Sequence, residues 1–141
     1  MQEPTWIAAS VVLAINDEQL AEHGGVSGVR DHGLLESALS RPRNRYAYEG
    51  ASPLALAASY AHGITKNNPF FDGNKRTSLI ITELFLNLNG AELSASDDAV
   101  VLTWLRLADG SLSESDLEAW ITANSRRSRQ PKLVGCGYGC F

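Results

Sequence analysis

The segment 79–88 constrains the fold more than any other part of the chain, because it is the most hydrophobic stretch. Seven of its ten residues are apolar, and Asn89-Gly90 directly behind it is a typical helix end. A helix that is apolar on most of its sides must be surrounded by other elements. The sequence therefore predicts a nearly buried central helix over about residues 74–89.

The other segments also carry helical signals, and none alternates between apolar and polar residues. We therefore expect an all-α fold, a compact bundle of about six helices, without a sheet of any size. The first helix is expected over about residues 7–22, with Val11, Val12 and Ile15 on one face, and Gly24-Gly25 ends it. We expect a second helix from Asp31 to Pro42, a third from Ser52-Pro53 to about Lys66, and a fifth from Ser96 to Leu107. A sixth is expected to begin at the capping-box segment from Ser113 to Asp116.

Residues 43–50, Arg-Asn-Arg-Tyr-Ala-Tyr-Glu-Gly, show no helical period and follow a proline. Proline closes a helix because it lacks the N–H that the next turn needs. The prediction for this stretch is a short exposed flap or hairpin.

Composition bounds the class of protein. With 141 residues, 44% of them apolar, the chain suits one domain with a core of ordinary size. A net charge of −4 argues against a nucleic-acid partner, and neither a signal peptide nor a membrane-spanning stretch is visible. A soluble cytoplasmic protein with no membrane partner is the expectation.

The composition changes at Ser125, so the predicted organisation is a domain over 1–124 and a tail over 125–141. The tail is first basic and then rich in glycine and cysteine, which favours a flexible extension over a function of its own. Cys136 and Cys140 alone are too few ligands for a structural metal site.

The polar loop before the central helix carries the residues suited to chemistry. Gly73 lets a ligand approach the backbone closely, and the free N–H groups of a helix start favour an anion. Asn74 adds an amide, Lys75 a point charge and Arg76 a two-pronged donor for phosphate oxygens. Asp72 is a hard oxygen ligand of the kind that Mg²⁺ prefers.

A simpler interpretation is that Asp72 caps the helix and the two cations lie in solvent. Two cations at a helix N-terminus oppose the helix dipole, which favours an anionic ligand there. The pattern is not a P-loop, because Asn74 separates Gly73 from Lys75.

Transfer chemistry also needs a general base beside the anion site. The natural place, the first position of the loop, holds Asn68, whose amide does not titrate near neutral pH. His62 lies upstream on an alanine-rich helix and is expected to be structural. Phe70 and Phe71 flank the loop, and at least one of them is expected to anchor it in the core.

The stretch 68–77, Asn-Pro-Phe-Phe-Asp-Gly-Asn-Lys-Arg-Thr, resembles the signature of the Fic/Doc superfamily, His-x-Phe-x-Asp-(Gly/Ala)-Asn-(Gly/Lys)-Arg. It is most similar to the Doc (death-on-curing) branch, and every position but the first matches. Weaker similarity extends over about residues 7–124 and includes the segments 22–25, 33–38 and 86–90.

This resemblance implies a compact helical toxin of a toxin–antitoxin pair, with ATP and Mg²⁺ as its cofactors. It also implies a Phd-type antitoxin whose C-terminal helix fills a groove over the site. Asp72 would serve the metal, and Phe70 would anchor the loop. Residues 73–74 would form the anion cradle, and residues 75–76 would bind phosphates.

Two positions separate the branches of the superfamily. AMP-transferring members usually have glycine where this chain has Lys75 and a second arginine where it has Leu79. The resemblance therefore implies a Doc-like kinase that passes the γ-phosphate of ATP to a hydroxyl of elongation factor Tu and stops translation, with AMP transfer as the alternative. Arg45, Tyr46 and Tyr48 of the expected flap would help to align that protein substrate.

The departure from the signature is Asn68, which stands where the superfamily has its catalytic histidine. Asn16 is a second departure, since relatives often carry histidine there. Losing a general base typically costs about 10²–10⁴-fold in rate. The expectation is therefore a disabled or attenuated enzyme, whether deliberately inactivated or naturally changed. A non-catalytic nucleotide- or peptide-binding module and a plain helical interaction domain stay open.

Overall fold

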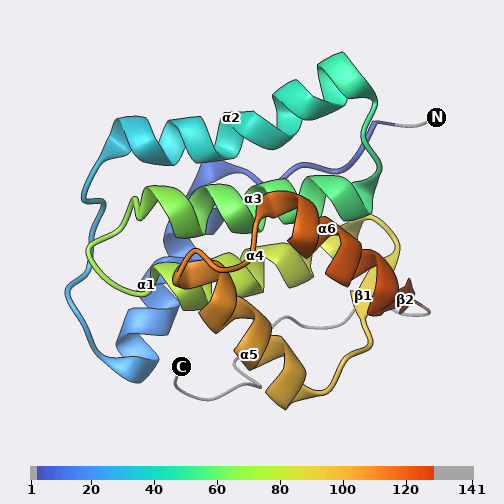
Figure 1. Cartoon of the computed structure of the whole chain (residues 1–141). Coiled ribbons are helices and arrows are strands. Elements are labelled where there is room, and N and C mark those ends of the chain that lie inside the picture. Colours follow the sequence, from blue (N-terminus) through green and yellow to red (C-terminus); the bar gives the residue numbers. More distant parts are fainter. Residues whose placement is uncertain (1–2, 129–141) are drawn as a thin grey trace.

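The computed structural model describes residues 3–128, and within that range the chain forms six helices and two short strands (Figure 1). The helical bundle that the sequence predicts is confirmed. None of the helices in the described range combines the length and apolarity needed to cross a membrane. The elements are α1 (Ala9–His23), α2 (His32–Glu49), α3 (Pro53–Asn67), α4 (Asn74–Leu88), β1 (Ala91–Leu93), α5 (Asp97–Ala108), α6 (Glu114–Ala123) and β2 (Ser125–Arg127).

The centre of the bundle is the antiparallel pair α3 and α4, in place of α4 alone. Ten residues of α3 are buried, compared with eight of α4. Helix α3 contacts α2, α4, α5 and α6, and α1 packs against α4. Small residues allow this crowding: a Cβ added to Gly63 of α3 would lie 3.3 Å from Cα of Ala38 in α2. Alanine and glycine therefore place α3 where larger side chains would keep the neighbouring helices apart.

The predicted helix starts are confirmed by their capping bonds. The side chain of Asp31 accepts from the N–H of Leu34 at 2.9 Å, and Ser52 and Ser96 cap α3 and α5 in the same way. Ser113 and Asp116 form the reciprocal capping box of α6. In α1, Val12 is buried as expected, whereas Val11 is exposed, so only part of the predicted apolar face reaches the core.

The predicted flap at residues 43–50 is wrong, because α2 continues through Pro42 and ends only at Glu49. Pro42 is buried inside the helix. A proline there removes one helical hydrogen bond and costs about 3 kcal/mol or more. Contacts between the second half of α2 and distant parts of the chain offset this cost.

Those contacts come from side chains of residues 43–50, the segment predicted to be a flap. Arg45 donates hydrogen bonds to Glu114 and Glu118 of α6. The ring of Tyr46 packs edge-on against Trp6, with 5.8 Å between the ring centroids. Tyr48 is 88% exposed and contributes nothing comparable. Arg45 and Tyr46 therefore hold the helix in place.

A small antiparallel ribbon was not expected. Strands β1 and β2 pair with Ala91 opposite Arg127 and Leu93 opposite Ser125. Arg126 also forms an ion pair with Glu92 at 3.3 Å. The first residues of the predicted tail thus belong to the folded domain. The rest of that tail, with both cysteines, lies outside the described residues.

Candidate functional site

The signature loop joins the two central helices. Its first residue, Asn68, is the C-cap of α3 and has a left-handed backbone, with φ 47° and ψ 57°. Phe70 is 1% exposed and anchors the loop in the core, as predicted, while Phe71 is 53% exposed. The loop is therefore fixed at a buried ring, and the polar residues on either side of that ring reach the surface.

The segment 24–31, between α1 and α2, lies along this loop and is bonded to it through the backbone. The N–H of Arg30 donates to the carbonyl of Pro69 at 2.7 Å, and the N–H of Phe71 donates to Gly28. Val29 and Phe70 form an isolated antiparallel bridge. The segment beside the site is thus residues 24–31 and not the predicted flap at residues 43–50.

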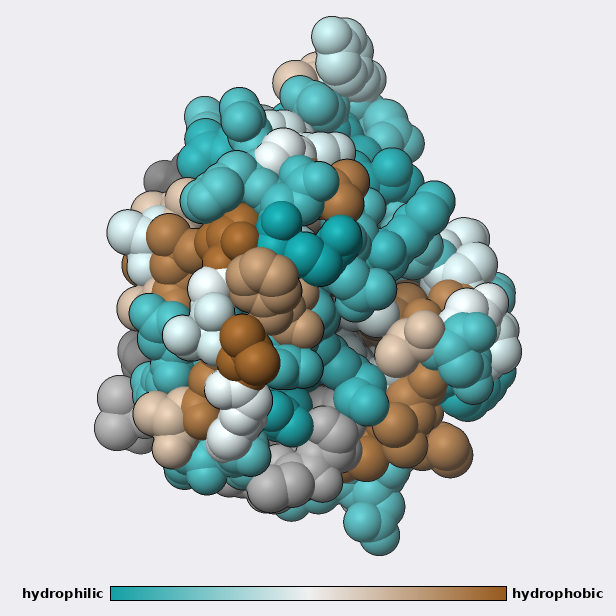
Figure 2. All heavy atoms as spheres, turned by 90° about the vertical axis from the view of Figure 1, so that its left-hand side faces the viewer, coloured by the Kyte–Doolittle hydropathy of each residue, from teal (hydrophilic) through white to brown (hydrophobic). Residues whose placement is uncertain are grey.

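A cavity of about 300 Å³ opens where these two loops meet the start of α4. It lies on the side of the molecule that faces the viewer in Figure 2, a surface on which hydrophilic side chains predominate between separate hydrophobic patches. The structure thus brings five predicted site residues together in one polar cavity and adds two glycines that were not predicted. The lining is Gly24, Gly25, Asp72, Gly73, Asn74, Lys75 and Arg76.

Five predicted site residues are not part of this lining: Arg45, Tyr46 and Tyr48 lie on α2, and two others belong to the signature loop. Asn68 is exposed at the end of α3, and Phe70 is buried beneath the loop. Asn68 therefore borders the candidate site from the α3 side, and Phe70 acts on it only by fixing the loop.

The start of α4 has no capping side chain from its N-cap residue. That residue is Gly73, with φ 77°, which carries no side chain that could accept from the first N–H groups. A Cβ at Gly73 would lie 3.2 Å from Nδ2 of Asn16, so both the backbone angle and the space require glycine. A helix N-terminus without a side-chain cap is a favourable place for an anion, because its N–H groups and its dipole both attract negative charge.

Asp72 fits a magnesium ion that is shared with a phosphate-bearing ligand. One carboxylate oxygen, Oδ2, accepts the N–H of Val26 at 2.7 Å. No other hydrogen bond to the carboxylate is found within residues 3–128. Mg²⁺ commonly takes one or two carboxylates, several waters and phosphate oxygens. Within the described residues no cluster of three or more His, Cys, Asp or Glu side chains could hold a metal alone, so any Mg²⁺ here would need the ligand's phosphates.

The side chain of Asn74 is used to close the loop. Its Nδ2 donates to the carbonyl of Phe70, and its Oδ1 accepts the N–H of Phe70, both at 3.0 Å. The amide therefore holds the turn between residues 70 and 74. Because this amide is already bonded to Phe70, Asn74 would contact a bound anion through its backbone N–H.

Asn16 supports the site from α1, and sequence reasoning did not find this role. It is 1% exposed, and its Nδ2 donates to the carbonyl of Asp72 at 3.0 Å and to Oγ1 of Thr77 at 3.1 Å. One bond joins α1 to the loop just before α4, and the other joins it to the first turn of α4. The available signal was an amide four residues after Val12, on the face of α1 that reaches the core.

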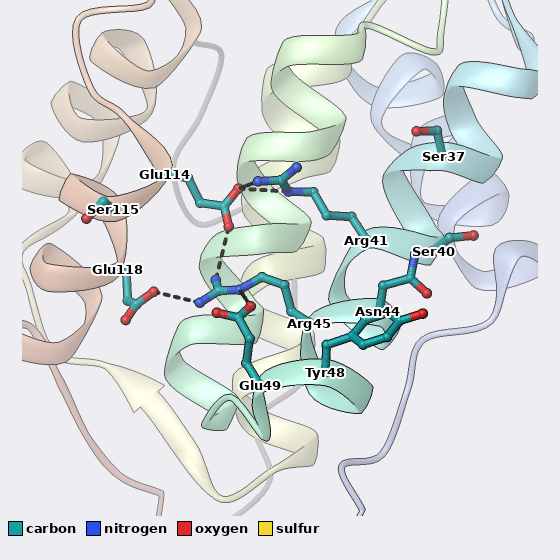
Figure 3. A pocket seen from close by; sticks show the side chains of 10 residues that line it. All are labelled: Ser37, Ser40, Arg41, Asn44, Arg45, Tyr48, Glu49, Glu114, Ser115 and Glu118. Carbon is teal, nitrogen blue, oxygen red and sulfur yellow. Dashed lines mark hydrogen bonds and ion pairs between the residues drawn. The ribbon is translucent and has the colours of Figure 1, made fainter.

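A larger cavity, of about 750 Å³, lies between α2 and α6 (Figure 3). Its charges are paired with one another: Arg41 and Arg45 both reach Glu114, at 2.6 and 3.0 Å, and Arg45 also reaches Glu49. His62 lies 3.4 Å from the same carboxylate. Because this network joins α2, α3 and α6, it has a structural role, and the smaller cavity carries the candidate chemistry.

The ionisation of this network follows from burial and hydrogen bonding. Burial raises the pKa of Glu114, but hydrogen bonds from Ser59 and Arg41 outweigh it, so that the pKa lies below its ordinary value. Burial lowers the pKa of His62 and outweighs the attraction of Glu114. The preferred state is therefore an ionised Glu114 beside a neutral His62 at pH 7.

The fold and the cavity together define a helical protein with a candidate phosphate-binding loop at the start of a central helix. Comparison with known proteins identifies the family of this helical protein. The sequence profile of the Fic/DOC family matches residues 6–86, and this chain belongs to that family. The family that the sequence analysis inferred is thus confirmed.

Two curated relatives belong to the Doc branch. The chain is 32% identical to the "Protein kinase doc" of Escherichia phage P1 over 112 residues, which cover 79% of this chain and 88% of the relative. It is 38% identical to the "Toxin Doc" of Mycolicibacterium smegmatis over 77 residues, which cover 53% of this chain and 59% of that relative.

Proposed function

We propose that this chain is a Doc-like toxin of a toxin–antitoxin system, a protein phosphotransferase that uses ATP and Mg²⁺ and that Asn68 attenuates. The observation that carries the proposal is the cavity at the start of α4. It combines a carboxylate (Asp72), an uncapped helix N-terminus (Gly73) and two cations (Lys75 and Arg76). The name of the phage relative, a protein kinase, supports phosphoryl transfer over AMP transfer.

The proposed reaction transfers the γ-phosphoryl group to a hydroxyl of a protein substrate. The hydroxyl oxygen attacks the γ-phosphorus, its proton passes to a base, and the bond to the bridging oxygen breaks to release ADP. The helix N–H groups, Lys75 and Arg76 would bind the phosphate oxygens, and Asp72 would hold Mg²⁺, which would supply positive charge to the phosphates. The amide of Asn68 cannot take the proton, so the chain binds ATP and turns it over slowly.

The decisive test is the Asn68→His variant. Position 68 has a positive φ, a conformation in which asparagine and histidine are both enriched, so the backbone accepts the change. We expect growth arrest on expression and a rise of about 10²–10⁴-fold in transfer of label from γ-labelled ATP. An Asn67→His variant, with the same side chain one residue earlier, is the matched control and should stay inactive.

Other outcomes of this test separate the alternatives. Transfer of label from α-labelled ATP to the protein substrate would establish AMP transfer as the reaction. If the Asn68→His variant is inactive but binds ATP, and the Arg76→Ala variant loses that binding, the chain is a non-catalytic nucleotide-binding module. Absence of nucleotide binding by calorimetry would leave only a helical interaction domain.

The proposed partners are a Phd-type antitoxin and a translation factor similar to elongation factor Tu, both in the cytoplasm. A groove of about 450 Å³ between the N-terminal segment, α1 and α2 supports an antitoxin helix as its occupant, since Ile7, Leu13, Leu35 and Leu39 line it. In cells that express the Asn68→His variant, a Leu13→Glu change should abolish rescue by the antitoxin and leave the arrest intact. Rescue that survives the change would place the antitoxin elsewhere.

A further inference from the structure

Arg30 makes an unusual set of bonds to the end of α3. Its Nε donates to the carbonyl of Asn68 at 2.8 Å, and its terminal NH2 nitrogen donates to the carbonyl of Asn67 at 2.9 Å. Its backbone N–H donates to the next carbonyl, that of Pro69, at 2.7 Å. One residue of the α1–α2 loop thus holds three consecutive carbonyls of the signature loop.

The carbonyls that Arg30 binds surround a residue with an uncommon backbone conformation. Asn68 is the only residue other than glycine with a positive φ in the described range. It also precedes Pro69, whose ring restricts the backbone of the residue before it. A sparsely populated conformation is kept where surrounding contacts enforce it. The contacts around Asn68 are the hydrogen bond from its N–H to the carbonyl of Ile64 and the two hydrogen bonds from the guanidinium of Arg30.

From this geometry we propose that Arg30 is the positioning residue for position 68. By binding the carbonyls of Asn67 and Asn68 together, its guanidinium holds residue 68 in the left-handed conformation and so sets the direction in which that side chain leaves the backbone. The inference rests on the proposed function only in assigning residue 68 to the reaction. The role of Arg30 in holding the conformation of residue 68 applies to the unsubstituted sequence, with asparagine at position 68.

Lysine cannot replace this contact. The two carbonyls are bound by two different nitrogens of one planar group, whereas the three donors of an ammonium rotate about one nitrogen and have no fixed planar spacing. The alternative role, a cation that only stabilises the C-terminus of α3, would be met by lysine equally well. The Arg30→Lys variant therefore distinguishes a role in holding the conformation of residue 68 from simple charge stabilisation of the end of α3.

The first measurement needs no activity. In isotope-labelled protein, the Cα and Cβ chemical shifts and the HN–Hα coupling of Asn68 report its left-handed conformation. We expect Arg30→Ala and Arg30→Lys to lose this signature while the shifts of α3 up to Ile64 stay unchanged. The inference is overturned if Asn68 keeps its left-handed signature in both variants, whatever the protein's function proves to be.

The second measurement uses the Asn68→His background. There, Arg30→Ala should lower kcat by about 10–100-fold, the size expected when a reacting group is misplaced by about 1 Å, and leave KM for ATP within about twofold. Arg106→Ala, which removes an exposed arginine from the last turn of α5, is the matched control and should leave both constants unchanged. An unchanged kcat for Arg30→Ala, or equal losses in ATP affinity and kcat, would contradict the positioning role. If Asn68→His itself has no activity, the proposed function fails and the spectroscopic result alone decides the inference.

Discussion

The Oδ2 atom of Asp72 accepts a hydrogen bond of 2.7 Å from the backbone N–H of Val26, so the carboxylate that we assign to Mg²⁺ also holds the α1–α2 loop. A Cβ on the neighbouring Gly25 would lie 2.8 Å from Leu20 and 3.1 Å from Cβ of Asp72, so the two loops are in close contact here. The proposed metal ligand is therefore also the side chain that holds the α1–α2 loop.

Two substitutions of Asp72 separate these roles. Asp72→Asn keeps an oxygen that can accept from Val26 but loses the charge that Mg²⁺ prefers. We expect it to weaken binding of Mg²⁺–ATP in calorimetry without faster hydrogen exchange in residues 24–31. Asp72→Ala should weaken binding and also speed exchange in that loop. Equal Mg²⁺–ATP affinity for the native chain and both variants would rule out Asp72 as the metal ligand.

The glycine at the start of α4 is expected to be essential for two reasons that a control can separate. Gly73→Ala introduces both a strained φ and a contact with Asn16, whereas Gly110→Ala introduces a similar φ of 85° in open space. The strain alone costs about 1–2 kcal/mol, so chemical denaturation should show that loss for Gly110→Ala and a larger one for Gly73→Ala. Phosphate or ATP binding should fall only in Gly73→Ala. Equal losses of stability for the two variants would show that the contact with Asn16 is unimportant.

Arg45 and Tyr48 test the correction to the predicted flap. Arg45→Met removes a donor to Glu114 and Glu118 and leaves Arg41 as the remaining arginine of α2 that binds Glu114. It should lower the free energy of unfolding by about 1–3 kcal/mol. Tyr48→Ala, on the same helix but exposed, should change it by less than about 0.5 kcal/mol. Urea denaturation followed by circular dichroism measures both. A larger effect for Tyr48 than for Arg45 would contradict the structural role of the α2–α6 network.

The lowered pKa of Glu114 predicts how stability depends on acid. A carboxyl group whose pKa falls on folding stabilises the protein fully above its ordinary value of 4.5, and this stability is lost as the pH falls through the folded-state pKa. The loss of stability caused by Glu114→Gln should therefore be full at pH 7 and shrink as the pH falls below 4.5. A difference that stays constant over this range would mean that the carboxylate is not ionised in the fold.

His62 predicts a second, separate decline. Its folded-state pKa lies below the ordinary 6.5, so the unfolded chain binds the proton more readily and stability falls as the pH drops from about 6.5 toward the folded-state value. Thermal unfolding of the native chain should show this decline, and a His62→Gln variant should show less of it. Titration of the His62 ring by NMR gives the pKa directly, and a value above 6.5 would refute the prediction.

The sequence was most informative where the relevant contacts are local. Helix caps at Asp31, Ser52 and Ser113 bind N–H groups three residues away, so their chemistry is visible in a short window. The cavity residues 72–76 are likewise consecutive, and Phe70 anchors them from two residues earlier. For the same reason the family and the helical class followed from the sequence.

The tertiary structure alone decided the features that depend on distant partners. Helix α2 continues past Pro42 because Arg45 and Tyr46 meet α6 and Trp6, and no local pattern reports those contacts. Strand β2 exists because β1 lies beside it, over thirty residues away in the chain. Asn16 and Arg30 reach the site only once α1 and the α1–α2 loop pack against α4 and the end of α3. Backbone carbonyls bind these side chains, and because every residue has a carbonyl, only the folded geometry selects which ones are bound.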